Sequence, residues 1–157
     1  MQLKILAIGK TDDKELGKLI QEYEKRLQRF AKLQWQIIPD IKNTKKLSQL
    51  EQKRKEGGFI LKEIEPTDYV VLLDENGKEF TSRKFAQWLA KKQHIGSRKV
   101  VFIIGGPYGF DPAVEERSDF KMALSKMTFS HQMIRLFFIE QIYRAFSILN
   151  NLPYHHD

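Results

Sequence analysis

Short apolar runs alternate along the chain with longer segments of mixed polarity. Residues 3–8, 69–73 and 99–104 are almost continuously apolar, which is typical of strands buried on both faces of a parallel sheet. Residues 33–38 alternate in polarity and predict a more exposed strand. The segments between these runs carry helical periodicity. The pattern therefore predicts an α/β fold, with a mostly parallel sheet flanked by helices.

Two of the predicted helices begin at polar capping residues. The first is capped by Thr11 or Asp12 and extends to about residue 30. The second is capped by Thr81 or Ser82 and extends to about residue 92. Both place apolar side chains at helical spacing, so each is expected to pack one face on the sheet.

Glycine pairs suggest where other segments break. Residues 43–64 are lysine-rich and only weakly amphipathic, which predicts a solvent-facing, mobile helix that Gly57-Gly58 interrupts. Asn76-Gly77 predicts a tight turn directly after the strand at residues 69–73.

The last third of the chain carries the strongest indication of a ligand site. The apolar strand at its start runs into Gly105-Gly106-Pro107-Tyr108-Gly109, called here the glycine turn. Missing side chains at a strand end let a ligand approach the backbone closely. Pro107 removes an amide donor, and neither phosphate-binding glycine motif occurs. The turn therefore favours a flat adenine or a ribose edge over a pyrophosphate, with an ordinary strand-to-loop turn as the alternative.

Acidic and histidine residues add few further candidates. Asp74 and Glu75 could accept hydrogen bonds from ribose hydroxyls, but acidic residues beside an Asn-Gly turn are more often solvated turn residues, and that interpretation is favoured. The four histidines lack the spacing of a zinc site, and there are no cysteines, so no metal is expected.

Residues 131–149 predict a helix that is apolar on nearly every side. Such a helix is buried from several directions, so we expect core contact on one side and a subunit contact on the other. Glu140 and Arg144 have the spacing of a helical ion pair. Arg135 falls roughly opposite Arg144 and is left for a ligand or RNA.

Composition sets the class of protein. The 157 residues suit a single domain, and the net charge of +7 favours encounter with a polyanion such as RNA. The apolar start of the chain is too short to span a membrane and lacks a signal-peptide pattern. A cytoplasmic location is expected.

Ordered motifs across essentially the whole chain carry a family resemblance. They are Leu6-Ala7-Ile8-Gly9-Lys10, Glu22-Tyr23-Glu24-Lys25-Arg26, Ile103-Ile104-Gly105-Gly106-Pro107-Tyr108-Gly109, Leu124-Ser125-Lys126-Met127-Thr128-Phe129-Ser130-His131, Arg135, Glu140-Gln141-Ile142-Tyr143-Arg144-Ala145 and Pro153-Tyr154-His155. Together they resemble the RlmH family of large-subunit rRNA pseudouridine methyltransferases, which belongs to the SPOUT superfamily.

The resemblance implies a fold, a cofactor and partners. It implies one SPOUT-type domain over residues 1–157 with a C-terminal trefoil knot, an exception to the rule that chains do not thread loops. It implies a homodimer that uses S-adenosylmethionine to methylate N3 of a pseudouridine in a 23S rRNA stem-loop on the assembled ribosome. By position, the implied cofactor-binding residues are Leu73, Gly105, Gly106, Leu124, Ser125, Lys126, Met127, Thr128 and Phe129.

The implied chemistry needs a group that handles the proton on N3. The sulfonium already activates the methyl group, so the protein mainly positions the acceptor and stabilises its anion. The catalytic candidates are His131, Arg135, Tyr154 and His155, without individual roles. Members of this family usually carry Arg or Lys after the terminal Tyr-His, whereas this chain has His156, which is largely neutral at pH 7.

Two alternatives belong to other functional classes. A protein of the same fold could bind RNA or the ribosome without turnover. An unrelated α/β enzyme could bind an adenine nucleotide at the glycine turn. Binding of S-adenosylmethionine, or of ATP or NAD in competition with it, separates the three.

Overall fold

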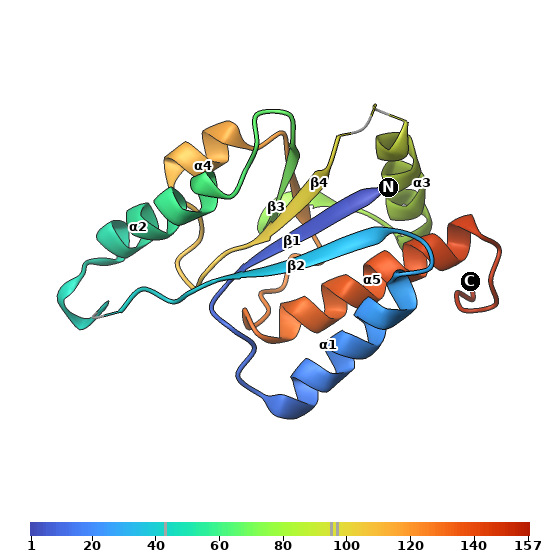
Figure 1. The fold of residues 1–157 in the computed structure, drawn as a ribbon, viewed down its shortest axis with the longest axis horizontal. Coiled ribbons are helices and arrows are strands. Elements are labelled where there is room, and N and C mark those ends of the chain that lie inside the picture. Colours follow the sequence, from blue (N-terminus) through green and yellow to red (C-terminus); the bar gives the residue numbers. More distant parts are fainter. Residues whose placement is uncertain (43, 95, 97) are drawn as a thin grey trace.

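A five-stranded, fully parallel sheet forms the centre of the computed structural model, which describes residues 1–42, 44–94, 96 and 98–157 (Figure 1). The strand order is β2-β1-β4-β3-β5. The strands are β1 (Gln2–Ile8), β2 (Lys32–Ile38), β3 (Tyr69–Glu79), β4 (Val100–Ile104) and β5 (Phe120–Ala123). The helices are α1 (Lys14–Leu27), η1 (Thr44–Lys46), α2 (Gln49–Lys62), α3 (Ser82–Gln93), α4 (Pro112–Arg117) and α5 (Met133–Leu149).

Helices cover both faces of the sheet, as the continuous apolar strands require. The larger core joins one sheet face to α1, α3 and α5, and includes Phe102 and Phe138, whose rings lie 4.9 Å apart. The smaller core joins the other face to α2 and α4 through Ile60 and Val114. Figure 1 shows α5 starting near the edge where the strands end and returning toward the edge where they begin. The predicted α/β class is therefore confirmed.

Strand β3 does not end at the predicted turn. It pairs with β5 up to Leu73, shifts register, and pairs again from Lys78. Residues 74–77 leave the ladder, and a Cβ on Gly77 would lie 2.6 Å from the Met122 nitrogen. The Asn76-Gly77 pair thus lets an irregular strand pass close to β5, and the prediction of a tight turn after residue 73 was wrong.

Helix α2 is continuous through Gly57-Gly58, so the predicted interruption was also wrong. A Cβ on Gly57 would lie 2.8 Å from the Asp111 Cβ, which shows that this glycine allows α4 to pack closely. The helix begins at the Ser48 cap rather than near residue 43, which itself lies outside the described residues.

Other differences concern helix ends and short elements. The cap of α1 is Asp13, whose side chain accepts from the Leu16 nitrogen at 2.9 Å, rather than Thr11 or Asp12. The cap of α3 is Thr81, as predicted. Helix α4 and strand β5 were not predicted, although Asp111 followed by Pro112 is a typical helix start.

Candidate active site

A cavity of about 690 Å³ lies where β3, β4 and β5 end. Parallel strands bring their carboxyl ends to one edge, where α/β proteins commonly bind ligands. Its walls are the glycine turn, the segment between β5 and α5, and the excursion in β3. The lining residues include Leu73, Asp74, Glu75, Gly105, Gly106, Leu124, Ser125, Met127, Thr128, Phe129 and His131.

The glycine turn is packed so closely that side chains are excluded. A Cβ on Gly105 would lie 2.9 Å from the Phe110 ring, and a Cβ on Gly106 would lie 2.9 Å from a Glu56 carboxylate oxygen. Gly109 has a φ of +80°, which other residues rarely adopt. The turn therefore presents backbone to the cavity, as the sequence predicted.

The segment after β5 forms the facing wall. The Ser125 hydroxyl accepts from the Met127 nitrogen at 3.1 Å, and the Ser130 hydroxyl accepts from the Met133 nitrogen at 3.0 Å as α5 begins. The predicted residues 124–129 all line the cavity except Lys126, which is exposed. The structure thus brings eight of the nine predicted cofactor residues to one cavity.

The excursion in β3 supplies two carboxylates. Asp74 and Glu75 both line the cavity, and Asp74 Oδ1 accepts from the Asn76 nitrogen at 2.8 Å. The structure therefore places both carboxylates at the cavity, with Asp74 half-buried and Glu75 exposed. Their carboxylates can accept hydrogen bonds from hydroxyl or amino groups of a ligand.

His131 and Arg135 lie near each other but differ sharply in accessibility. His131 is exposed and lines the cavity. Arg135 is 0% exposed and donates to the carbonyls of Ile8 (2.7 Å), Gly9 (2.7 Å) and His131 (2.9 Å). Burial lowers the pKa of Arg135, opposed by the charges of Asp12 and Asp40. In this arrangement the guanidinium fixes the start of α5 against the end of β1 instead of facing the cavity.

Glu56 is a part of the site that the sequence did not reveal. It is 5% exposed, lies against the glycine turn, and accepts from Gln52 Nε2 at 3.3 Å. Burial raises the pKa of Glu56; Asp40 acts in the same direction, while the Gln52 bond and His131 oppose it. Nothing in a lysine-rich helix distinguishes this glutamate from a surface one before the packing is known.

The chain end lies away from the cavity. Tyr154 donates to Glu140 Oε1 at 3.0 Å, and its hydroxyl is 3.0 Å from the Tyr23 hydroxyl. Glu140 also accepts from Arg144, so the predicted helical ion pair is present. Burial, followed by the Tyr23 and Glu140 hydrogen bonds, raises the pKa of Tyr154 far above its usual value. Tyr154 therefore keeps its proton near neutral pH.

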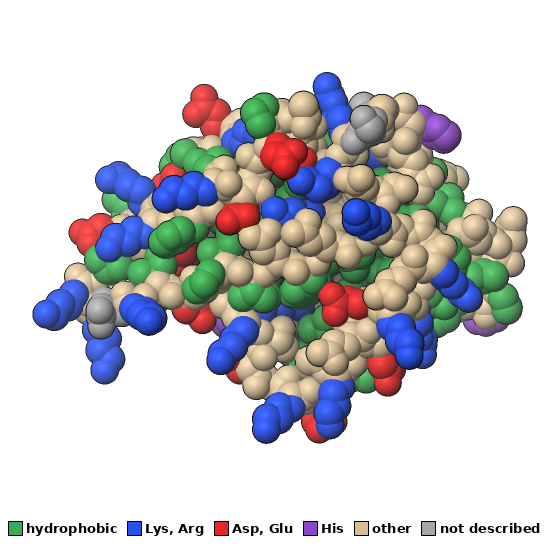
Figure 2. Space-filling model, in the orientation of Figure 1, with side chains coloured by type: hydrophobic (Ala, Val, Ile, Leu, Met, Phe, Trp, Pro, Cys, Tyr) green, Lys and Arg blue, Asp and Glu red, His purple; other side chains and the backbone are tan. Residues whose placement is uncertain are grey.

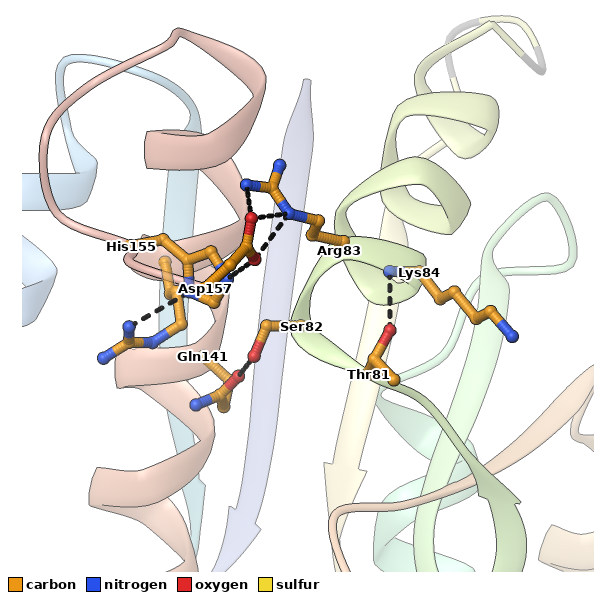
Figure 3. A network of polar contacts seen from close by, with 8 residues as sticks. Thr81, Ser82, Arg83, Lys84, Gln141, His155 and Asp157 are labelled. Carbon is orange, nitrogen blue, oxygen red and sulfur yellow. Dashed lines mark hydrogen bonds and ion pairs between the residues drawn. The ribbon is translucent and has the colours of Figure 1, made fainter.

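His155 is held in a network of side chains. Its Nδ1 is 3.3 Å from Arg144 Nη1, and its Nε2 is 3.2 Å from Asp157 Oδ1. Figure 3 shows Asp157 between His155 and Arg83, with which it forms an ion pair, and Ser82 bonded to Gln141 beside them. The network ties the chain end to α3 and α5. Within one copy, Tyr154 and His155 are not among the residues that line the cavity.

Neither a metal site nor a membrane-spanning helix is found in the described part of the chain. Among residues 1–42, 44–94, 96 and 98–157, no group of three or more metal-ligating side chains is positioned to hold an ion. No helix in that described part of the chain is long and apolar enough to cross a membrane.

The parallel sheet and the cavity at its carboxyl edge define an α/β protein with a ligand site at the strand ends, and a family model assigns it to the SPOUT methyltransferase class. A family model described as "Predicted SPOUT methyltransferase" matches residues 1–155. In fold, the chain is similar to a probable methylase family protein from Haemophilus influenzae, with a TM-score of 0.56 at 11% identity over 99% of this chain and 70% of that one.

Full-length relatives narrow the class further. Proteins named "Ribosomal RNA large subunit methyltransferase H" are 55% identical in Christiangramia forsetii, over 99% of both chains, and 55% identical in Parabacteroides distasonis, over 100% of both. The one from Flavobacterium psychrophilum is 56% identical over 99% of both chains. The chain belongs to the RlmH family of SPOUT methyltransferases, which confirms the family expected from its motifs.

Proposed function

We propose that this chain is a homodimeric, S-adenosylmethionine-dependent methyltransferase of the cytoplasm. Its proposed target is N3 of a pseudouridine in a 23S rRNA stem-loop, methylated on the assembled ribosome. The observation that carries the proposal is the backbone-lined cavity at residues 105–109 and 124–130, in a chain whose full-length relatives are named as large-subunit rRNA methyltransferases. The C-terminal trefoil knot is part of the same proposal.

The cavity suits an adenosine bearing a positive charge. Its volume of about 690 Å³ lies within the range of small-molecule sites. Gly105 and Gly106 leave a flat backbone surface for the base, and Asp74 and Glu75 place negative charge beside it. When bound, S-adenosylmethionine supplies an electrophilic methyl group on a sulfonium.

The protein's own residues then position the acceptor and handle its proton. The acceptor nitrogen must lose a proton as it forms the new bond to carbon. His131 is the exposed candidate at the cavity, and Glu56 interacts with it electrostatically. Arg135 acts as a positioning residue that holds the backbone of His131.

A homodimer accounts for both the exposed apolar surface and the distant chain end. Met127, Phe129, Met133 and Phe137 are all at least 40% exposed, and Met127 and Phe129 line the cavity. The rings of Phe129 and Phe137 lie 5.4 Å apart. An apolar cluster of this kind is typical of a subunit contact. A second copy on this surface would cover it and could bring its own chain end to the cavity.

Nucleoside mass spectrometry tests the reaction directly. Large-subunit rRNA from a strain lacking this gene should contain no N3-methylpseudouridine, and the intact gene should restore it. Persistence of the modified nucleoside in the deletion strain would show that the proposed reaction is wrong.

Calorimetry tests the cofactor site. Gly105→Val should weaken S-adenosylmethionine binding more than about tenfold, because the new side chain displaces Phe110 and enters the adenosine wall. Gly58→Val is the matched control, since a Cβ there meets nothing within 4 Å. Circular dichroism checks that both variants fold.

A substitution of an exposed residue tests the cofactor site independently, should the Gly105→Val protein fail to fold. Glu75 is exposed at the cavity wall, so Glu75→Arg should leave the fold intact. It should weaken binding of the cationic donor about five- to tenfold more than binding of the uncharged product S-adenosylhomocysteine. Equal loss for both ligands, or no loss, would contradict the placement of the sulfonium near β3.

A further inference from the structure

We propose that a cluster of cations on η1, the first half of α2 and the turn residue Lys42 holds the phosphate backbone of rRNA next to the target nucleotide. This cluster, called the basic arm, consists of Lys42, Lys45, Lys46, Lys53, Arg54 and Lys55. The inference rests on the proposed function, because it assigns a surface to the RNA that the cavity would act upon.

Charge is the first observation. Residues 42–55 contain six cations and a single carboxylate, Glu51, and so contribute +5 to a net charge of +7 for the whole chain. Among the ion pairs of the described residues, none includes a cation of the basic arm. Figure 2 shows Lys and Arg side chains gathered at the end of the molecule formed by η1 and the start of α2.

Packing is the second observation. The buried residues of α2 are Glu56, Gly57 and Ile60, all in its second half, where the helix packs on α4. The first half of α2 has no buried residue. Like charges that are crowded without counterions repel one another and destabilise the helix. A polyanion bound to the first half of α2 would relieve this repulsion.

Position is the third observation. Gln49, the first residue of α2, lines the same cavity as the glycine turn and the segment before α5. Gln49 lies in the sequence between the two parts of the basic arm, residues 42–46 and 53–55, so both parts flank a residue of the cavity wall. An RNA strand whose target base enters the cavity would have its flanking phosphates beside these cations.

An RNA backbone fits this surface better than an acidic protein does. Several flexible cations in a row suit a polymer with one negative charge at every nucleotide, and each phosphate contact releases counterions. The arm would supply affinity and position, while the cavity recognises the base.

Paired neutral substitutions test the proposal. Lys45→Gln/Lys46→Gln and Arg54→Gln/Lys55→Gln each remove two charges from exposed residues of the arm. Lys84→Gln/Lys91→Gln removes two exposed charges from α3 and is the matched control. Binding to assembled ribosomes from a strain lacking the gene, and to protein-free large-subunit rRNA, is measured over a range of KCl concentrations.

The expected result is specific to phosphate contacts. Each lost phosphate contact should reduce the steepness of the plot of log affinity against log salt concentration by about 0.7–0.9. A variant that loses two contacts should therefore show a slope that is shallower by about 1.4–1.8. KM for the RNA should rise about tenfold or more with little change in kcat, and S-adenosylmethionine affinity should stay unchanged. The control pair should resemble the unmodified protein.

The other outcomes overturn the proposal in distinguishable ways. If the unmodified protein methylates rRNA and the arm pairs behave like the control, the arm proposal alone is wrong. If the arm pairs lose binding to ribosomes but not to protein-free rRNA, a ribosomal protein is the partner and the arm proposal is again wrong. If the unmodified protein binds S-adenosylmethionine but neither ribosomes nor rRNA, the arm and the proposed function both fail.

Discussion

Glu56 shows how one buried carboxylate can make the site sensitive to pH. It lies against the glycine turn and is shielded from water, so its protonated form is favoured in the folded chain. A raised pKa in the folded state means that the native protein holds this proton at a pH where the unfolded chain has lost it. The contribution of Glu56 to the free energy of unfolding is therefore most favourable below its pKa in the unfolded chain. This contribution is lost as pH rises through its pKa in the folded chain.

We expect Glu56→Gln to be more stable than the unmodified protein at pH 7. The amide keeps the shape but avoids a buried charge, and Tm should rise by about 2–4 °C, which is about 1 kcal/mol for a chain of this size. The advantage should shrink as pH falls toward 4, because the carboxyl of the unfolded chain then becomes protonated as well. Thermal unfolding across pH 4–8 measures it, with Glu116→Gln on the exposed side of α4 as the control. An equal Tm at pH 7 would show that this carboxylate is not penalised by burial.

Arg135 shows how a charged residue can act on the site without reaching it. We expect Arg135→Met to cost about 3 kcal/mol or more in the free energy of unfolding, because it leaves three carbonyl acceptors without their donor. Arg135→Lys should recover only part of this, since an ammonium cannot reproduce the forked geometry.

Denaturant unfolding measures both variants. Arg29→Met is the control, because Arg29 is exposed and stacks on Phe30 at 4.6 Å, a contact worth at most about 1 kcal/mol. A stable Arg135→Met protein that has lost only methyl transfer would instead indicate direct contact with the substrate.

At the scale of elements, sequence patterns predicted the strands better than the irregularities. The apolar runs that became β1 and β4 are buried almost completely, and Thr81 caps α3 as predicted. Two of the errors fall at Gly57 and Gly77, which were interpreted as breaks. Both allow another element to approach closely, and that cause is invisible until the neighbouring element is placed.

The candidate site was also predicted only in part from the sequence. The cofactor residues were predictable because they follow strands, and parallel strands end at one edge of the sheet. The catalytic candidates were taken from motifs spread over residues 131–155, and motif order does not reveal which of them share a space. The structure places His131 at the cavity, Arg135 beneath it, and Tyr154 and His155 away from it.

At the scale of the whole molecule, the proposed dimer must join two separated halves of a site. The exposed side chains of Met133 and Phe137 begin α5 beside the cavity, while the chain end is tied to α3 by Arg83 and Asp157. We expect Phe137→Asp to halve the mass in sedimentation equilibrium to that of one 18.5 kDa chain, because it places a charge in the apolar contact. The control is Leu19→Asp on α1, because Leu19 is also exposed and the variant adds the same surface charge.

Mixing two inactive variants tests whether the halves come from different copies. Gly105→Val obstructs the adenosine wall of the cavity and His155→Ala alters the chain end, so at a limiting concentration of S-adenosylmethionine neither homodimer should methylate rRNA. In a heterodimer of the two, one cavity is intact and would face an unaltered chain end from the partner subunit. Random pairing makes about half of the dimers mixed, each with one working site of two, so about one quarter of the normal activity should return. If each chain instead completed its own site, every copy in the mixture would still carry a defect, and no activity would return.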